Sequence, residues 1–190
     1  CSASLVAVHS AARALQHAEC IRHMAAGVNL MLVPSTSVGM AIAGMTSSEG
    51  RCHTFDSRAD GYGRSEACGA VVLQQMDSGS GSGVVIKGTA VNQDGRSASF
   101  MAPNGPSQEE VAQAAVLCAQ CSGLHCVEAH GTGTALGDPT EVRALAQVLP
   151  HAALAGVKAV VGHLEPAAGM VGAHTLMAAL RRRHVAPNAH

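Results

Sequence analysis

The residue types best suited to chemistry lie in one stretch, from Val127 to Glu141. An apolar run ends at His130, and alternating glycine and threonine residues follow directly as Gly131-Thr132-Gly133-Thr134. Glycines let a ligand approach the backbone, and threonine hydroxyls can donate hydrogen bonds to it or accept them from it. Such a stretch would direct an imidazole from the tip of a strand into a cleft. The alternative is a tight turn whose histidine forms only local hydrogen bonds.

A helix start follows this stretch and would hold it in place. Asp138 is suited to the N-cap position, Pro139 to the first helical position and Glu141 to closing a capping box. The sequence therefore predicts a strand that ends at His130, a glycine-rich turn, and a helix that continues through Leu149.

Cys1 is a second candidate for chemistry. Leu5, Val8, Ala12 and Leu15 recur at helical spacing and predict a helix from Ser2 to about Glu19. The partial positive charge and free N–H groups of a helix N-terminus stabilise a thiolate, so Cys1 has the setting of a nucleophile. The alternative is that Cys1 only marks where the sequence begins.

Strand and helix patterns alternate along the rest of the chain and predict α/β layers. Strands are expected at 24–32, 70–73, 84–90 and 156–161, and the long irregular segment 46–64 is expected to be functional. Ser35 or Ser37 should cap a short helix through Ala43, and Ser107 a longer one. The inward face of the longer helix should carry Val111, Ala114, Ala115 and Cys118, a last helix should start near 165, and a flexible connector should span 79–83.

Composition limits the function classes. The 190 residues suit one domain, 47% of them are apolar and 13% charged, and the 2% of aromatic residues leave a core of Ala, Val, Leu and Met. Twelve basic and thirteen acidic side chains predict no nucleic-acid or membrane partner. No signal peptide is visible, and seven cysteines, an odd number, favour a reducing, cytoplasmic location, with a plastid still open. Cys118 and Cys121 lack a second ligand pair, so no metal is expected.

Several ordered motifs together resemble the β-ketoacyl synthase family, in particular the ketosynthase domains of type I polyketide synthases. They are the stretch His130–Thr134, the nucleophile motif at Cys1-Ser2-Ala3-Ser4-Leu5, the segments 50–56 and 59–62, the segments 91–95 and 102–106, and the lysine–histidine motif from Lys158 to His163. Ala159 and Val160 stand where the family has two polar residues.

The resemblance implies a thiolase-like α-β-α-β-α layered sandwich, here partial. Residues 1–92 would be the end of its N-terminal half and residues 93–190 most of its C-terminal half. The sequence would begin at the nucleophile cysteine and lack the strands that precede it in the family. We therefore expect this piece alone not to turn over.

The resemblance also implies the chemistry and the residues that perform it. The reaction would be decarboxylative Claisen condensation of an acyl group on Cys1 with malonyl-acyl carrier protein, in polyketide or fatty acid biosynthesis. His130 and His163 would stabilise the enolate, Lys158 would support them by hydrogen bonding and charge, and Thr132 and Thr134 would hold the phosphopantetheine arm. No bound cofactor, an acyl carrier protein partner and a homodimer are implied.

Two other functions stay open. A thiolase-type condensing enzyme would need a second catalytic cysteine late in the chain, and none follows Cys126. A catalytically silent partner or scaffold is the other. Taken singly, His163 could be a helix-entry residue and Lys158 a strand-end residue whose ammonium reaches solvent. His9, His17, His23 and His174 are expected to be ordinary residues without partners.

Overall fold

The computed structural model describes residues 1–76, 83–97 and 102–189, so residues 79–82 of the predicted connector lie outside it. The described elements, in chain order, are α1 (Ala3–Gln16), β1 (Arg22–Asn29), α2 (Pro34–Ile42), β2 (Ala67–Gln74), α3 (Gly105–Ala119), β3 (Cys126–Glu128), α4 (Gly137–Val148), β4 (Ala153–Ala155), α5 (Lys158–Val161), the 3₁₀ turn η1 (Glu165–Ala167) and α6 (Ala168–Arg182).

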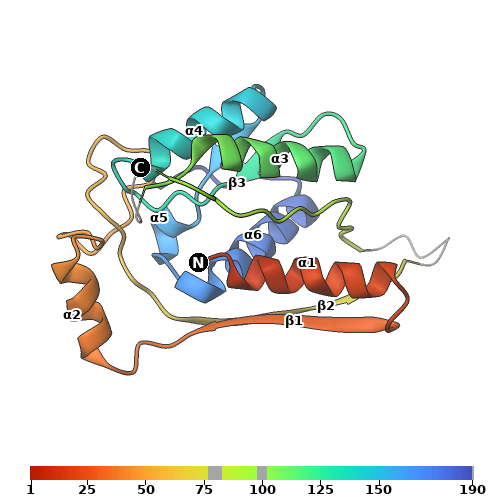
Figure 1. Ribbon diagram of the computed structural model, residues 1–190, viewed down its shortest axis with the longest axis horizontal. Helices are drawn as coiled ribbons and strands as arrows, with labels where there is room; N and C mark the ends of the chain where they lie inside the picture. Colours follow the sequence, from red (N-terminus) through yellow and green to blue (C-terminus); the bar gives the residue numbers. More distant parts are fainter. Residues whose placement is uncertain (77–82, 98–101, 190) are drawn as a thin grey trace.

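The elements lie in layers (Figure 1). The antiparallel pair β1–β2 forms one layer, α1 and α6 lie above it, the parallel pair β3–β4 comes next, and α3 packs with α4 at the far side. The short helix α2 lies at one end of the molecule, away from these layers. The predicted α/β layering is therefore observed.

The β1–β2 sheet carries α1 on its inner face. Its register runs from Arg22 opposite Gln74 to Asn29 opposite Ala67. Ala25 and Gly27 face inward, and a Cβ atom on Gly27 would lie only 2.7 Å from the Cβ atom of Ser4 in α1. This close approach of helix and strand is what a core rich in alanine and glycine allows.

The inward face of α1 agrees with the helical spacing in part. Val8 and Leu15 are buried as predicted, together with Ser4 and Ala11. The prediction for Leu5 is wrong, because its side chain is 51% exposed. The buried face is turned towards Ser4, whose hydroxyl accepts a hydrogen bond from the backbone N–H of Met170 at 3.0 Å.

Two predicted strands are wrong. The segment 84–90 is irregular and runs against α3, where a Cβ atom on Gly88 would lie 2.5 Å from the backbone nitrogen of Ala119. The segment 156–161 is not a strand either, because β4 ends at Ala155 and Lys158 begins the short helix α5. In both segments tertiary packing overrides the β propensity of valine-rich sequence.

The predicted caps differ as well. Helix α2 begins at Pro34 with no side-chain cap, so neither Ser35 nor Ser37 caps it. Helix α3 begins at Gly105, and the side chain of Asn104 accepts from the backbone N–H of Ser107, so Ser107 is the donor rather than the cap. No residue of α3 is fully buried. On its predicted inward face Val111 and Ala115 are half-buried, whereas Ala114 and Cys118 are exposed.

Candidate active site

The turn after β3 has a backbone that requires glycine. Gly131 and Gly133 have φ angles of 44° and 76°, in the region that side chains disfavour. A Cβ atom on Gly133 would also lie 2.6 Å from the backbone nitrogen of His53. The alternation of glycine and threonine in this stretch therefore has a steric reason, and it brings the turn against the segment that contains His53.

Two carboxylates hold this turn, which differs from the predicted helix cap. Asp138 lies inside α4 rather than at its N-cap, and it accepts hydrogen bonds from the backbone N–H groups of Gly133 (3.1 Å), Thr134 (3.3 Å) and Phe55 (2.9 Å). Glu141 accepts from the backbone N–H groups of His130 (2.5 Å) and Gly131 (2.8 Å). Both side chains reach back over the turn and satisfy its donors, so they position His130.

Sequence reasoning recognised Asp138 and Glu141 only as helix-capping residues and missed this role. The signal in the sequence was their spacing, because residues three apart on the first turn of a helix share one face. Two acidic residues there can face a preceding glycine-rich turn whose N–H groups have no strand partner.

The fold brings Cys1, His163 and His130 together. The Sγ atom of Cys1 lies 3.0 Å from Nε2 of His163, although 162 positions separate them in the sequence. The two imidazole rings meet edge to face, with centroids 5.4 Å apart and an angle of 86° between planes. His163 is 1% exposed, whereas His130 and Cys1 reach the surface. An exposed cysteine thus lies beside a buried imidazole.

The irregular segment before β2 fixes His163 from the other side. The backbone N–H of His163 donates to the carbonyl of Gly63 at 2.6 Å, and the N–H of Ser65 donates to the carbonyl of His163 at 3.0 Å. The Tyr62 ring meets the imidazole edge to face with centroids 5.0 Å apart. The predicted functional segment 46–64 therefore contacts the candidate site directly.

The surroundings keep both imidazoles neutral. Burial, then the positive charge of Lys158, lowers the pKa of His163 to about 3. For His130, part of which reaches solvent, desolvation and the Lys158 charge act in the same direction and lower its pKa. A neutral imidazole carries one N–H, and the Nδ1 atom of His163 is buried without a partner among the described residues. Nε2 is therefore the ring atom that interacts with the thiol.

Lys158 is buried, with 4% of its surface exposed, at the start of α5. Burial lowers the pKa of its ammonium, while the charges of Glu141 and Glu128 oppose this shift. Burial likewise raises the pKa of both carboxyls. Within the described part of the chain, the Lys158 side chain has no hydrogen bond and no carboxylate within 4.0 Å. The hydrogen bonding expected of Lys158 is therefore not observed among these residues, and its charge is the second cause, after desolvation, of the lowered pKa of both imidazoles.

Thr132 and Thr134 lie in the same turn as His130. Thr132 is 7% exposed, and its hydroxyl lies 3.3 Å from that of Thr134. The Thr134 hydroxyl also accepts a hydrogen bond from the backbone N–H of Gly137 at 3.2 Å. Thr132, Thr134 and His130 thus lie in one turn. Asp138 and Glu141 accept hydrogen bonds from this turn, and the ring of His163 meets that of His130.

Four histidines outside this site differ from expectation. His9 and His174 do have partners, because His9 Nδ1 lies 2.8 Å from the Thr89 hydroxyl and His174 Nδ1 lies 2.8 Å from the carbonyl of Met170. His17 and His23 also have contacts, to the Arg13 side chain and to the Met24 carbonyl. The prediction that these four residues lack partners is wrong.

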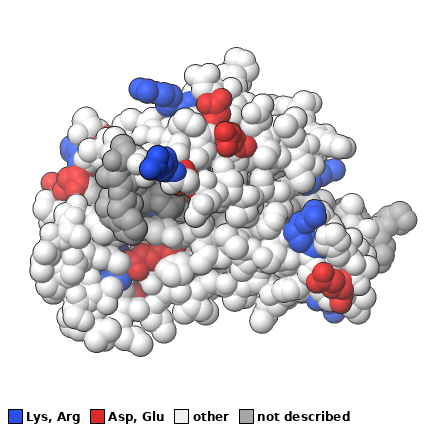
Figure 2. Space-filling view, viewed as in Figure 1, with Lys and Arg blue, Asp and Glu red and all other residues white. Residues whose placement is uncertain are grey.

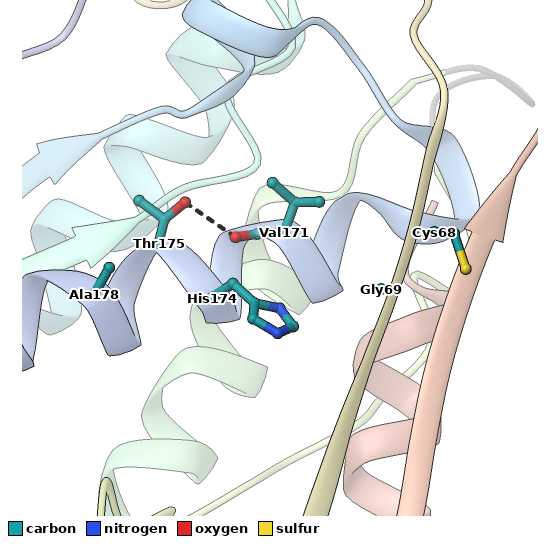
Figure 3. A pocket seen from close by; sticks show the side chains of 6 residues that line it. All are labelled: Cys68, Gly69, Val171, His174, Thr175 and Ala178. Atoms are coloured by element: carbon teal, nitrogen blue, oxygen red, sulfur yellow. Dashed lines mark hydrogen bonds between the residues drawn. The ribbon is translucent and has the colours of Figure 1, made fainter.

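A shallow pocket of about 390 Å³ lies between β2 and α6 (Figure 3). Cys68, Gly69, Val171, His174, Thr175 and Ala178 line it. None of the candidate site residues is among them, so this pocket is separate from the Cys1–His163 pair.

Surface charge, possible metal ligands and possible membrane spans are further features of the molecule to compare with the site. On the face shown in Figure 2, basic and acidic side chains are scattered over a mostly uncharged surface. Within residues 1–76, 83–97 and 102–189, no group of three or more His, Cys, Asp and Glu side chains is placed to hold a metal ion. In the same residues no helix is long and apolar enough to cross a membrane.

Two family models match the sequence. Residues 1–78 match the N-terminal domain of β-ketoacyl synthases, and residues 84–190 match the C-terminal domain.

Curated relatives include two different polypeptides of the phenolphthiocerol/phthiocerol polyketide synthase of Mycobacterium tuberculosis. The chain is 43% identical to one of them over 203 residues and 42% identical to the other over 200 residues. Both alignments cover 100% of this chain but only 11% and 13%, respectively, of those much longer proteins.

Solved ketosynthase structures superpose on this chain over nearly its whole length. The ketosynthase from module 6 of the bacillaene synthase of Bacillus subtilis superposes with a TM-score of 0.93 at 32% identity, over 99% of this chain and 36% of that chain. The oxazolomycin ketosynthase domain of Streptomyces albus gives a TM-score of 0.92 at 33% identity, over 100% of this chain and 36% of that one. These neighbours confirm the predicted thiolase-like fold.

Proposed function

Because the chain belongs to the β-ketoacyl synthase family, we propose that it carries the active site of a polyketide synthase ketosynthase, which condenses an acyl group on Cys1 with a malonyl group on acyl carrier protein. The observation that carries the proposal is the contact of 3.0 Å between Cys1 Sγ and His163 Nε2, with His130 beside it. The proposed division of the chain is residues 1–92 in the N-terminal half and 93–190 in the C-terminal half.

The first step loads the acyl group. The thiolate of Cys1 attacks the carbonyl carbon of an acyl thioester, the bond to the carrier sulfur breaks, and the carrier leaves as a thiol with the proton that Cys1 gave up. A thiol suits this exchange, since one thioester replaces another. The position of Cys1 just before α1 supports the step, because the free N–H groups of a helix N-terminus favour the thiolate.

The second step removes carbon dioxide and forms the new bond. Loss of carbon dioxide from the malonyl thioester leaves an enolate, and its negative charge would lie on the thioester oxygen. Two neutral imidazoles can donate ring N–H groups to that oxygen, and His130 and His163 are proposed for this role. The enolate carbon then attacks the acyl carbonyl carbon, and Cys1 leaves as a thiolate that takes up a proton from solvent.

The remaining predicted residues would bind the phosphopantetheine arm or set the charge state of the two imidazoles. We assign Thr132 and Thr134 to the phosphopantetheine arm, since both lie in the turn that presents His130. Desolvation and then the positive charge of Lys158 lower the pKa of both imidazoles, so we assign Lys158 to helping keep them neutral. The partners are acyl carrier protein and, in the intact domain, a second ketosynthase copy, with no separate cofactor. The reducing, cytoplasmic location inferred from the cysteine count remains part of this proposal.

One pair of measurements tests the proposal. After incubation of the full-length protein with an acyl thioester, mass spectrometry should find the acyl mass on Cys1. The His163→Ala variant should still load Cys1 but should release carbon dioxide from malonyl carrier protein about 100-fold more slowly, as expected when one donor to a developing oxyanion is removed. Acyl mass on Cys118 or Cys121 instead, or an equal loss of both activities, would contradict the assignment.

A further inference from the structure

A partly buried ion pair lies directly beside His163. The guanidinium of Arg64 donates from Nε to Oε1 of Glu165 at 2.6 Å and from Nη2 to Oε2 at 3.1 Å. The two side chains are 9% and 13% exposed. This two-point geometry fixes the direction of both side chains as well as their separation.

The backbone of Glu165 is in an unfavourable conformation. Its φ angle is +46°, which non-glycine residues rarely adopt. Only Leu164 separates it from His163, so the conformation at Glu165 sets the direction in which the chain leaves the histidine and enters η1 and α6. An unfavourable conformation persists only where surrounding contacts hold it. The ion pair with Arg64 is such a contact.

Arg64 is joined to His163 on the main chain as well. Its neighbours Gly63 and Ser65 make the two backbone hydrogen bonds to His163, and Arg64 itself pairs with His163 as an isolated parallel bridge. The remaining guanidinium nitrogen, Nη1, donates to the Ser37 hydroxyl of α2 at 2.5 Å. Arg64 therefore links the histidine to Glu165 on one side and to α2 on the other.

We propose that the Arg64–Glu165 ion pair is a positioning device for His163: it holds Glu165 in the left-handed conformation and thereby keeps the imidazole within reach of the Cys1 sulfur. Neither residue touches the reacting atoms, so both are positioning residues. The activity readout of this inference rests on the proposed condensing function, whereas its structural readout does not.

Substitutions at Glu165 separate the backbone effect from the loss of charge. Glu165→Gln removes the ion pair and leaves a side chain that disfavours positive φ. Glu165→Gly also removes the ion pair but adopts positive φ without steric cost. The ion pair between Arg58 and Asp56, with two contacts of 2.9 Å in the same irregular segment, supplies the matched control Asp56→Asn.

The experiment measures acyl loading and carbon dioxide release with the full-length protein. Glu165→Gln should slow carbon dioxide release about tenfold, because small displacements of a catalytic group cost one to two orders of magnitude in rate. Acyl loading should stay within about twofold of the parent. Glu165→Gly should recover most of the rate of carbon dioxide release, since this step depends on the position of His163. Asp56→Asn should leave both activities unchanged.

A crystal structure of each variant gives the second readout. In Glu165→Gln the distance from Cys1 Sγ to His163 Nε2 should exceed the parent 3.0 Å, and in Glu165→Gly it should return to it. If Glu165→Gln does not fold, Arg64→Lys serves in its place, since it keeps the charge but loses the two-point contact.

The outcomes distinguish the two proposals. An unchanged distance in Glu165→Gln, or an equal rate loss in Glu165→Gln and Glu165→Gly, would overturn the positioning role. A parent protein that releases no carbon dioxide would overturn the proposed function, and the distances would then still decide on the ion pair.

Discussion

At the scale of single residues, burial decides the protonation state of the site. An imidazole in water has a pKa near 6.5 and would be partly charged at neutral pH. In this protein burial and the Lys158 charge lower the pKa of His163 to about 3, so the ring stays neutral and can donate one N–H to an oxyanion. A charged imidazolium would instead stabilise the malonyl carboxylate that has to be lost.

This protonation state predicts a pH profile. Because the lowered pKa keeps His163 neutral until the pH falls far below 6.5, carbon dioxide release should show no acid limb with a midpoint near 6.5 between about pH 8 and 5. Lys158→Met removes a positive charge that lowers this pKa, so any acid limb due to His163 should move upward. Single-turnover release measured against pH checks both points, and a parent midpoint near the ordinary imidazole value would contradict the first.

Tyr62 offers a second prediction at the residue scale. Its ring contacts His163 edge to face, and its hydroxyl donates to the sulfur of Met40 at 3.4 Å. Tyr62→Phe keeps the ring and loses only a weak hydrogen bond, so carbon dioxide release should stay within about twofold. Tyr62→Leu loses an aromatic contact of about 0.5–1.5 kcal/mol, so the rate should fall several-fold. Equal rates for the two variants, measured at saturating malonyl carrier protein, would argue against a role for the ring.

At the scale of elements, the His130 turn is held by side chains that the helix start supplies. Asp138 and Glu141 of α4 accept backbone hydrogen bonds from the turn, and the Thr54 hydroxyl donates to the carbonyl of Gly131 at 2.7 Å. Without these side chains, the N–H and carbonyl groups of the turn would lack partners. Residues of α4 and Thr54 therefore hold the turn, and its shape depends on Gly131 and Gly133.

Replacing one of these glycines tests the turn. Gly133→Ala places a Cβ atom 2.6 Å from a backbone nitrogen at a φ of +76°, so it should lower the free energy of unfolding by more than about 2 kcal/mol. Gly39→Ala in α2 meets no atom within 4 Å and should be neutral or stabilising by up to about 1 kcal/mol. Thermal unfolding of both variants measures the difference, and similar midpoints would refute the steric argument.

At the scale of the whole molecule, small residues set the distance between layers. Gly27 of β1 faces α1 and η1, where its missing side chain makes room for Ser4 and Ala167. Gly69 of β2 similarly faces Met170 of α6. Since Cys1 precedes α1 and His163 precedes η1, the spacing of these layers also sets the distance between the sulfur and the imidazole.

The layer contact predicts the effect of one added methyl group. In Gly27→Ala the new Cβ atom would lie 2.7 Å from Ser4 Cβ and 3.1 Å from Ala167 Cα, so α1 or η1 has to move. Overpacking of this kind costs about 1–3 kcal/mol. We expect a lower unfolding midpoint together with slower acyl loading, because only Ser2 separates Cys1 from α1. A parent-like midpoint would show that the layers can separate without cost.

The sequence by itself determined the chemistry-bearing residues, the family and most elements. The helix spacing of α1, the strand before His130 and the helix after Pro166 are local patterns, and local propensity and periodicity suffice to predict them. The motifs at Cys1, His130 and Lys158–His163 are also contiguous, so resemblance identified them. The family models and solved ketosynthases bear out the family and fold, while the residue roles remain proposals.

Only the tertiary structure decided which side chains meet. The valine-rich segments 84–90 and 156–161 both have β propensity. Segment 84–90 is nevertheless irregular where it contacts α3, and Lys158–Val161 forms the short helix α5, in which Lys158 is buried. Asp138 and Glu141 have the spacing of a capping box, but their carboxylates satisfy N–H groups of the turn instead. The pair Arg64–Glu165 spans 101 positions. Contacts of this kind depend on how separate elements pack, and a local pattern does not contain that information.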